Sequence, residues 1–145
     1  MPSHRHFFPG GALALFLACV ACGSSGPPET TGFGAEPLVT ATSTHGTLSV
    51  AVRTSPQPPS VGIDEGELTV TDSTTGAPVD GLSLSVVPFM PAMGHGTSLV
   101  PTVTPLGHGK YQVENLELFM AGDWELRTSL KGSVTDTVNP VLYVP

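Results

Sequence analysis

Apolar and polar residues alternate with a period of two along the chain from about residue 45 onward. Leu48, Val50 and Val52 alternate with small or polar residues, and similar short segments occur at 68–70, 82–86, 99–103, 111–113, 124–128 and 138–144. Successive side chains of a strand point to opposite faces, so this alternation is typical of antiparallel strands with one buried face. Seven such segments predict an all-β fold, an immunoglobulin-like antiparallel β-sandwich of about seven strands over residues 45–145.

The composition agrees with this fold class and excludes several others. The 145 residues include 17 Gly and 15 Pro, which disfavour a helical bundle, and 39% hydrophobic residues, which suffice for a core. The formal charge is −7 with only five Lys and Arg, so we expect no nucleic-acid partner. No serine lies in a nucleophile-elbow context and no acidic pair forms a recognisable motif, so we do not expect an enzyme.

The N-terminal residues have the pattern of an export signal. A weakly basic segment precedes an apolar run at residues 10–21. A membrane-spanning helix needs about 20 apolar residues, and this run is shorter. Residues 1–21 are therefore predicted to be a signal peptide.

The end of that run resembles the cleavage site of bacterial lipoproteins, in the segment Val20-Ala21-Cys22-Gly23. The resemblance implies that Cys22 carries a lipid and holds the domain to a membrane, facing the periplasm or the cell exterior. Cys19 is an alternative lipidation site, and a soluble protein cut after Ala21 or an uncleaved anchor are alternative outcomes. Gly23 is not acidic, which favours the outer membrane if the cell is Gram-negative.

A tether is predicted between the lipid and the domain. Residues 22–44 are rich in Gly, Ser, Thr and Pro and show almost no helical or strand period, so we expect a flexible segment there. His45 lies at the junction with the domain, and we expect its side chain to be solvated.

Methionine and histidine residues gather in one part of the predicted domain. Beyond residue 22 the chain has three Met and three His, and five of these six lie within residues 90–120. The candidate metal ligands are Met90, Met93, His95, His108 and Met120. Thioether and imidazole together favour a soft cation, and Cu(I) fits best. His108 lies in a Gly-His-Gly turn. The loops of a sandwich gather at its two ends, so this turn could face the loop that contains Met93 and His95.

Packing offers an alternative explanation for some of these residues. Met120 has the parity of a buried strand face, which favours a core position, whereas Met90 suits a core position and a ligand equally well. Met93 and His95 follow the end of a strand, where packing explains them less well. His108 also suits a simple polar turn.

Several of these segments resemble a known family. They are Met90-Pro91-Ala92-Met93-Gly94-His95, then Gly109-Lys110-Tyr111, then Phe119-Met120-Ala121-Gly122-Asp123-Trp124-Glu125-Leu126. Together they resemble the YtkA-like domain, which is related to FixH. The resemblance implies an immunoglobulin-like fold outside the cytoplasmic membrane and, from some relatives, a link to copper handling and to the assembly of copper-containing oxidases.

Two hypotheses follow from the sequence. The first is a lipid-anchored module that binds Cu(I) through the Met/His cluster and passes it to a copper-accepting protein. The second is a metal-free module that presents loops or an edge strand to a partner in the cell envelope.

Overall fold

The structure is a computed structural model that describes residues 32–145, and all regular secondary structure in this range is β-strand. The predicted signal peptide (residues 1–21) and the predicted lipidation site, Cys22, lie outside the described residues. The strands are β1 (Val39–Thr42), β2 (Leu48–Ser55), β3 (Gly62–Asp72), β4 (Ser83–Met90), β5 (His95–Gly96), β6 (Thr102–Gly107), β7 (Lys110–Leu118), β8 (Gly122–Lys131), β9 (Asp136–Val138) and β10 (Val141–Val144). Within residues 32–145, no helix is long and apolar enough to cross a membrane.

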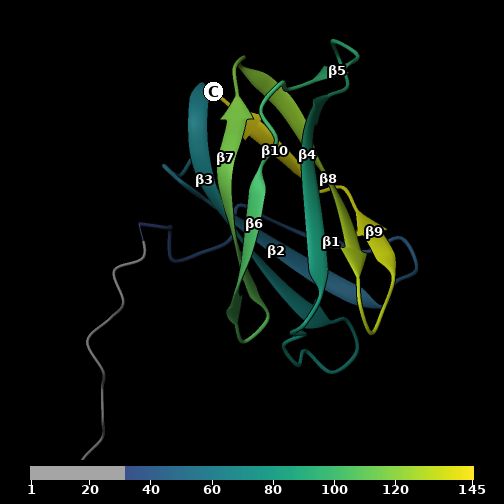
Figure 1. Cartoon of the computed structure of the whole chain (residues 1–145). Helices are drawn as coiled ribbons and strands as arrows, with labels where there is room; N and C mark the ends of the chain where they lie inside the picture. Colours follow the sequence, from purple (N-terminus) through teal and green to yellow (C-terminus); the bar gives the residue numbers. More distant parts are fainter. Residues whose placement is uncertain (1–31) are drawn as a thin grey trace, which may run out of the picture.

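The strands form two antiparallel sheets packed face to face (Figure 1). Sheet A has the order β1-β2-β3-β7-β6, and sheet B has the order β10-β8-β4-β5, with β9 also paired to β8. In an immunoglobulin constant domain, strands A, B, E and D form one sheet and strands C, F and G the other. Here the strands that correspond to A, B, E and D are β2, β3, β7 and β6. The strands that correspond to C, F and G are β4, β8 and β10. The predicted immunoglobulin-like sandwich is confirmed.

The described residues contain ten strands rather than seven, and the extra ones have simple origins. β1 is added at the edge of sheet A, and β5 is a two-residue strand paired with the end of β4. The segment expected to be one strand at 138–144 is split into β9 and β10, because Asn139 and Pro140 interrupt it.

The ordered domain begins before residue 45, which corrects the predicted boundary of the tether. Strand β1 lies inside the range 22–44 and pairs with β2, with Val39 opposite Val52. The preceding residues are held as well: Arg53 Nη2 donates to the carbonyl of Ala35 at 3.1 Å, and Gln57 Nε2 donates to that of Glu36 at 2.7 Å. The side chains of β1 are alternately half-buried and exposed, and none is fully buried. Its sequence therefore lacks the apolar alternation of an inner strand.

The core lies between the sheets and is formed mainly by the inward residues of seven of the ten strands, all except β1, β5 and β6. Its largest fully buried side chain is Trp124 on β8. The other buried apolar residues are Leu48, Val50, Val52, Leu68, Val70, Leu82, Val86, Met90, Tyr111, Val113, Leu116, Leu118, Leu126, Leu130, Val138, Leu142 and Val144.

The strand directions decide which loops meet. β4 ends at the end of the sandwich where β7 ends and β8 begins, and the β4–β5 hairpin lies there, at the top in Figure 1. The turn between β6 and β7 lies at the opposite end, at the bottom of the same view. The end of the sandwich where β4 and β7 end and β8 begins is called the Met/His end below. It holds four of the five predicted ligands: Met90, Met93, His95 and Met120.

Candidate metal centre

A tight hairpin positions the first group of candidate ligands. The amides of Met93 and Gly94 both donate to the carbonyl of Met90, at 3.1 and 3.0 Å, and Gly94 has a φ of 70°. The hairpin pairs Met90 directly with His95. Residues opposite each other in an antiparallel pair share one face, with Cβ atoms about 4.5–5.5 Å apart. Met90 and His95 are therefore close neighbours, and Met93 lies in the turn between them.

The turn between β7 and β8 supplies the second group. Met120 lies in this turn, and its carbonyl accepts a hydrogen bond of 2.9 Å from Nε1 of the buried Trp124. The ring of Phe119 meets Trp124 edge to face, with centroids 5.3 Å apart. This turn is thus tied to the core by a hydrogen bond and by an aromatic contact.

Two contacts join the hairpin to the turn. The imidazole of His95 stacks on the ring of Phe119, with centroids 5.5 Å apart and 12° between the planes. The Cε atom of Met90 lies 3.4 Å from the position that a Cβ atom would take on Gly122, which has a φ of 127°. This separation is an ordinary van der Waals distance, so the positive φ, rather than a lack of space, favours glycine at this position.

The three methionines differ sharply in exposure. Met90 is 3% exposed and belongs to the core, whereas Met93 is 55% exposed. Met120 is 36% exposed, so the expectation that it continues a buried face is wrong. The reason is that β7 ends at Leu118, and the turn that follows breaks the alternation before Met120.

The hydrogen bonding of His95 defines which of its nitrogens can bind a ligand. Its Nδ1 atom lies 3.2 Å from the carbonyl oxygen of Gly96. A carbonyl only accepts, so Nδ1 carries the proton and the lone pair lies on Nε2. A metal-binding histidine commonly donates its other N–H to a carbonyl in this way.

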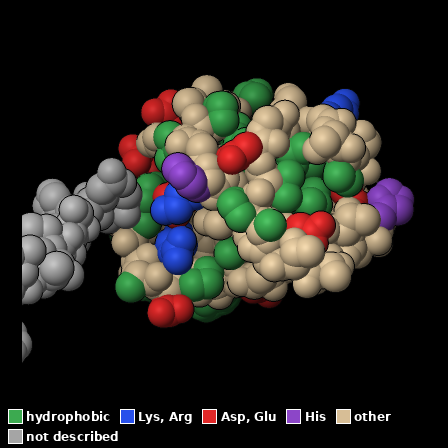
Figure 2. Space-filling model, turned by 90° about the horizontal axis from the view of Figure 1, so that it is seen from below, with side chains coloured by type: hydrophobic (Ala, Val, Ile, Leu, Met, Phe, Trp, Pro, Cys, Tyr) green, Lys and Arg blue, Asp and Glu red, His purple; other side chains and the backbone are tan. Residues whose placement is uncertain are grey.

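His108 does not belong to this group, which corrects the prediction that its turn faces the β4–β5 hairpin. It is exposed in the turn between β6 and β7, with a φ of 55°. Strand β7, from Lys110 to Leu118, separates that turn from the Met/His end. Its nine residues span roughly 30 Å at about 3.4 Å per residue. Figure 2 shows the molecule from below, from the end opposite the Met/His end, and histidine side chains are exposed on this face.

A second polar cluster, which the sequence pattern did not predict, lies at the end of the molecule opposite the Met/His end. His45 is exposed, as expected, but its Nδ1 donates to the buried carboxylate of Asp136 at 2.9 Å. Burial by itself would raise the pKa of Asp136, but hydrogen bonds outweigh it and hold this pKa well below its ordinary value. The donors are Ser43, Thr137, His45 and Thr47. This cluster, the Asp136 latch, joins the β1–β2 turn of sheet A to β9 of sheet B.

Replacing Asp136 by asparagine is expected to lower the midpoint of thermal unfolding at pH 7 by at least about 4 °C, because several donors lose an ionised acceptor. The folded-state pKa is lowered, so the stabilisation is present above the unfolded value of about 3.9 and is lost as the pH falls through the folded pKa. Thermal unfolding followed by circular dichroism at several pH values measures this effect. The difference in unfolding midpoint between the parent and the variant should shrink below about pH 4. The exposed Asp123→Asn is the matched control, and a difference that does not change with pH would contradict the assignment.

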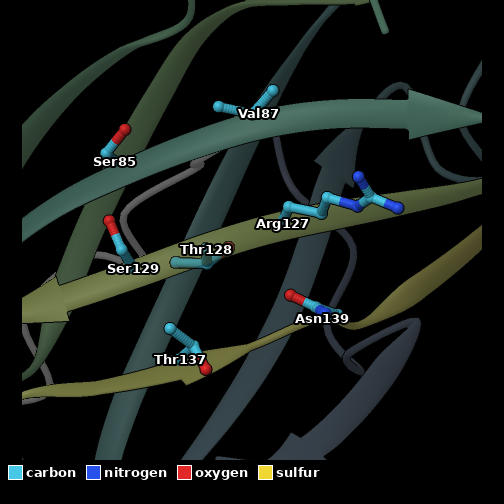
Figure 3. A pocket seen from close by; sticks show the side chains of 7 residues that line it. All are labelled: Ser85, Val87, Arg127, Thr128, Ser129, Thr137 and Asn139. Atoms are coloured by element: carbon cyan, nitrogen blue, oxygen red, sulfur yellow. The ribbon is translucent and has the colours of Figure 1, made fainter. Parts of the chain in front are cut away.

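A shallow groove on the outer face of sheet B is separate from these clusters. It has a volume of about 260 Å³ and is lined by Ser85, Val87, Arg127, Thr128, Ser129, Thr137 and Asn139. Figure 3 shows these side chains on β4, on β8 and on the segment that includes β9. The lining contains hydroxyl groups, an amide and a guanidinium but no thioether or imidazole, so it is not a site for a soft metal.

The part of the chain that the structure describes has no group of carboxylate, thiolate and imidazole donors that would suit a harder metal ion. Within residues 32–145, no three or more His, Cys, Asp or Glu side chains are grouped so that they could hold a metal ion. The donors at the Met/His end are instead two exposed thioethers, one imidazole nitrogen and the buried sulfur of Met90.

The fold and this end of the molecule define a class: a small immunoglobulin-like sandwich with methionine and histidine gathered beyond the ends of β4 and β7. The family model described as YtkA-like matches residues 42–129, and the chain belongs to that family. The match begins within β1 and ends in β8, so it includes the whole Met/His end. No curated protein and no solved structure shows significant similarity to the chain.

Proposed function

We propose that the domain binds Cu(I) through Met93, His95 and Met120 and presents the ion for delivery to a copper-accepting protein. The observation that carries the proposal is the stack of His95 on Phe119, which brings the β4–β5 hairpin against the turn that holds Met120. Met90 is buried in the core at the end of β4, where it pairs with His95 and supports the hairpin.

The donor chemistry supports Cu(I) over other common metals. Thioethers suit Cu(I) and do not suit Mg²⁺ or Ca²⁺, and imidazole binds copper readily. Each of these ligands is neutral, and Met93 and Met120 are exposed. Neutral, accessible ligands favour an ion that exchanges with a partner, which fits delivery better than permanent storage.

We further propose that the chain acts in the cell envelope, held to a membrane by a lipid on Cys22. The support is the segment Val20-Ala21-Cys22-Gly23 and the short apolar run that precedes it. The outer membrane remains the favoured location if the cell is Gram-negative.

A second candidate function is docking to an envelope partner without metal. Apolar side chains are exposed at the same end: Val61 is 54% exposed, Ile63 is 64% exposed and Phe119 is 39% exposed. Val61 and Ile63 flank Gly62, which pairs with Leu118 beside Phe119. A surface of this kind suits protein contact, with or without a bound ion.

The test is a Cu(I) titration in competition with a chromogenic chelator, on the full chain with Cys19 and Cys22 replaced by serine so that thiols do not bind the metal. We expect one equivalent of Cu(I) to bind, and Met93→Leu combined with Met120→Leu to lower the affinity about 100-fold. Leucine keeps the apolar volume but has no sulfur.

His108→Ala is the matched control and should leave the affinity unchanged, because His108 lies at the opposite end of β7. An affinity equal in the parent protein and in the double Met variant would refute the copper site and leave metal-free docking as the better explanation.

A further inference from the structure

The structure exposes two of the three methionines of the Met/His end and buries the third. Met93 is 55% exposed, Met120 is 36% exposed and Met90 is 3% exposed. A reagent in solution therefore reaches two thioethers directly, whereas it reaches the third only when the domain opens.

No thiol competes with these sulfurs inside the domain. Both cysteines of the chain, Cys19 and Cys22, precede residue 32, so the described residues contain only thioether sulfur. The single tryptophan, Trp124, is fully buried. Exposed methionine is thus the side chain of this domain that a hydroperoxide attacks most readily.

We propose that Met93 and Met120 are sites of reversible oxidation, and that their oxidation switches off Cu(I) binding. The second part rests on the proposed function. In the reaction, a hydroperoxide transfers its terminal oxygen to the thioether sulfur. The S–O bond forms as the O–O bond breaks, the sulfur loses two electrons, and the peroxide leaves as water or an alcohol.

The product has the wrong chemistry for Cu(I). In a sulfoxide, one sulfur lone pair is used in the bond to oxygen, and the accessible donor becomes a hard oxygen atom. Soft Cu(I) prefers thioether to oxygen ligands, so oxidation of Met93 and Met120 leaves His95 as the one strong donor among the three. The switch therefore acts through the ligands themselves.

Oxidation of Met93 and Met120 is not expected to disturb the fold. Met90 is the methionine that packs in the core, against the turn at Gly122. The hydrogen bond from Trp124 goes to the backbone carbonyl of Met120, which side-chain oxidation does not alter. Reversal uses a methionine sulfoxide reductase, in which a dithiol becomes a disulfide and the sulfoxide oxygen leaves as water.

The first experiment measures the order of oxidation. The full chain with Cys19→Ser and Cys22→Ser is treated with hydrogen peroxide without metal, and peptide mass spectrometry follows the gain of one oxygen atom at each methionine. Met93 and Met120 should react about tenfold faster than Met90, because Met90 reacts only through openings of the domain. Equal rates at all three residues would overturn the proposal.

The second experiment measures the consequence. After catalase removes the peroxide, Cu(I) titration against the chelator should show an affinity about 100-fold lower, with an unchanged circular dichroism spectrum. Stereospecific methionine sulfoxide reductases with dithiothreitol should restore the affinity. The Met93→Leu and Met120→Leu double variant, treated in the same way, should show no further loss.

The outcomes separate the two proposals. If the untreated protein binds Cu(I) and the oxidised protein binds it within about threefold as well, the switch is refuted and the copper site stands. If the untreated protein binds no Cu(I), the proposed function fails and the switch fails with it, although the order of oxidation still tests the modification sites.

Discussion

Replacing His95 by alanine is expected to lower the affinity for Cu(I) by about 100-fold, which corresponds to ~2.8 kcal/mol. His95 supplies the only nitrogen ligand of the proposed site, and its lone pair is fixed on Nε2 by the contact of Nδ1 with the carbonyl of Gly96. Chelator competition measures the change. Circular dichroism should show that the fold is retained, because His95 is half-buried at the end of a two-residue strand.

Phe119→Leu is the informative companion variant. It removes the ring on which the imidazole stacks and leaves every ligand in place. Residues that orient a ligand commonly contribute 10–100-fold to affinity, so we expect a loss of about tenfold. If Phe119→Leu had no effect while His95→Ala did, the stack would not position the imidazole. If His95→Ala had no effect, the proposed ligand set would be wrong.

Replacing Trp124 by alanine is expected to lower the free energy of unfolding by about 3–5 kcal/mol, the range for a large aromatic side chain lost from a core. Trp124 is fully buried, and it also ties the β7–β8 turn to the core through Phe119 and the carbonyl of Met120. Urea denaturation followed by circular dichroism measures the change, because the variant has no tryptophan fluorescence.

Trp124→Phe separates packing from the hydrogen bond. It keeps an aromatic ring and loses the N–H donor, so we expect a smaller loss of about 1–2 kcal/mol. The exposed Tyr143→Ala is the control and should change stability by less than about 0.5 kcal/mol. A Trp124→Ala protein as stable as the parent would contradict the central place of this residue in the core.

The fold was largely predictable, because alternation reports burial directly. The inner strands have a buried face of Leu and Val, and six of the seven predicted segments correspond to them. The segment at 99–103 was placed too early, because β6 begins only at Thr102 and Val100 is 77% exposed. β1 was missed because it is a short edge strand whose better-covered residues are only half-buried. β5 was missed because two residues cannot show a period, and Pro140 divides the last segment in a way that hydrophobicity does not reveal.

The site was only partly predictable, because alternation ends where a turn begins. Met120 was given the parity of the preceding strand, but the chain leaves the sheet after Leu118. His108 could have been excluded, since successive turns of antiparallel strands lie at alternate ends of a sandwich. The contacts of Phe119 with His95 and of His45 with Asp136 join distant parts of the chain, and alternation contains no signal for either.

The Asp136 latch has a consequence for the lifetime of the folded domain. His45 and Asp136 are 91 residues apart in sequence and lie on different sheets, so their contact requires both sheets to be formed and docked. Because the latch closes only when both sheets are docked, we infer that it forms after the rate-limiting step of folding. Interactions that are absent from the transition state mainly slow unfolding. On this inference the latch is a kinetic lock, which lengthens the lifetime of the folded domain by slowing its unfolding.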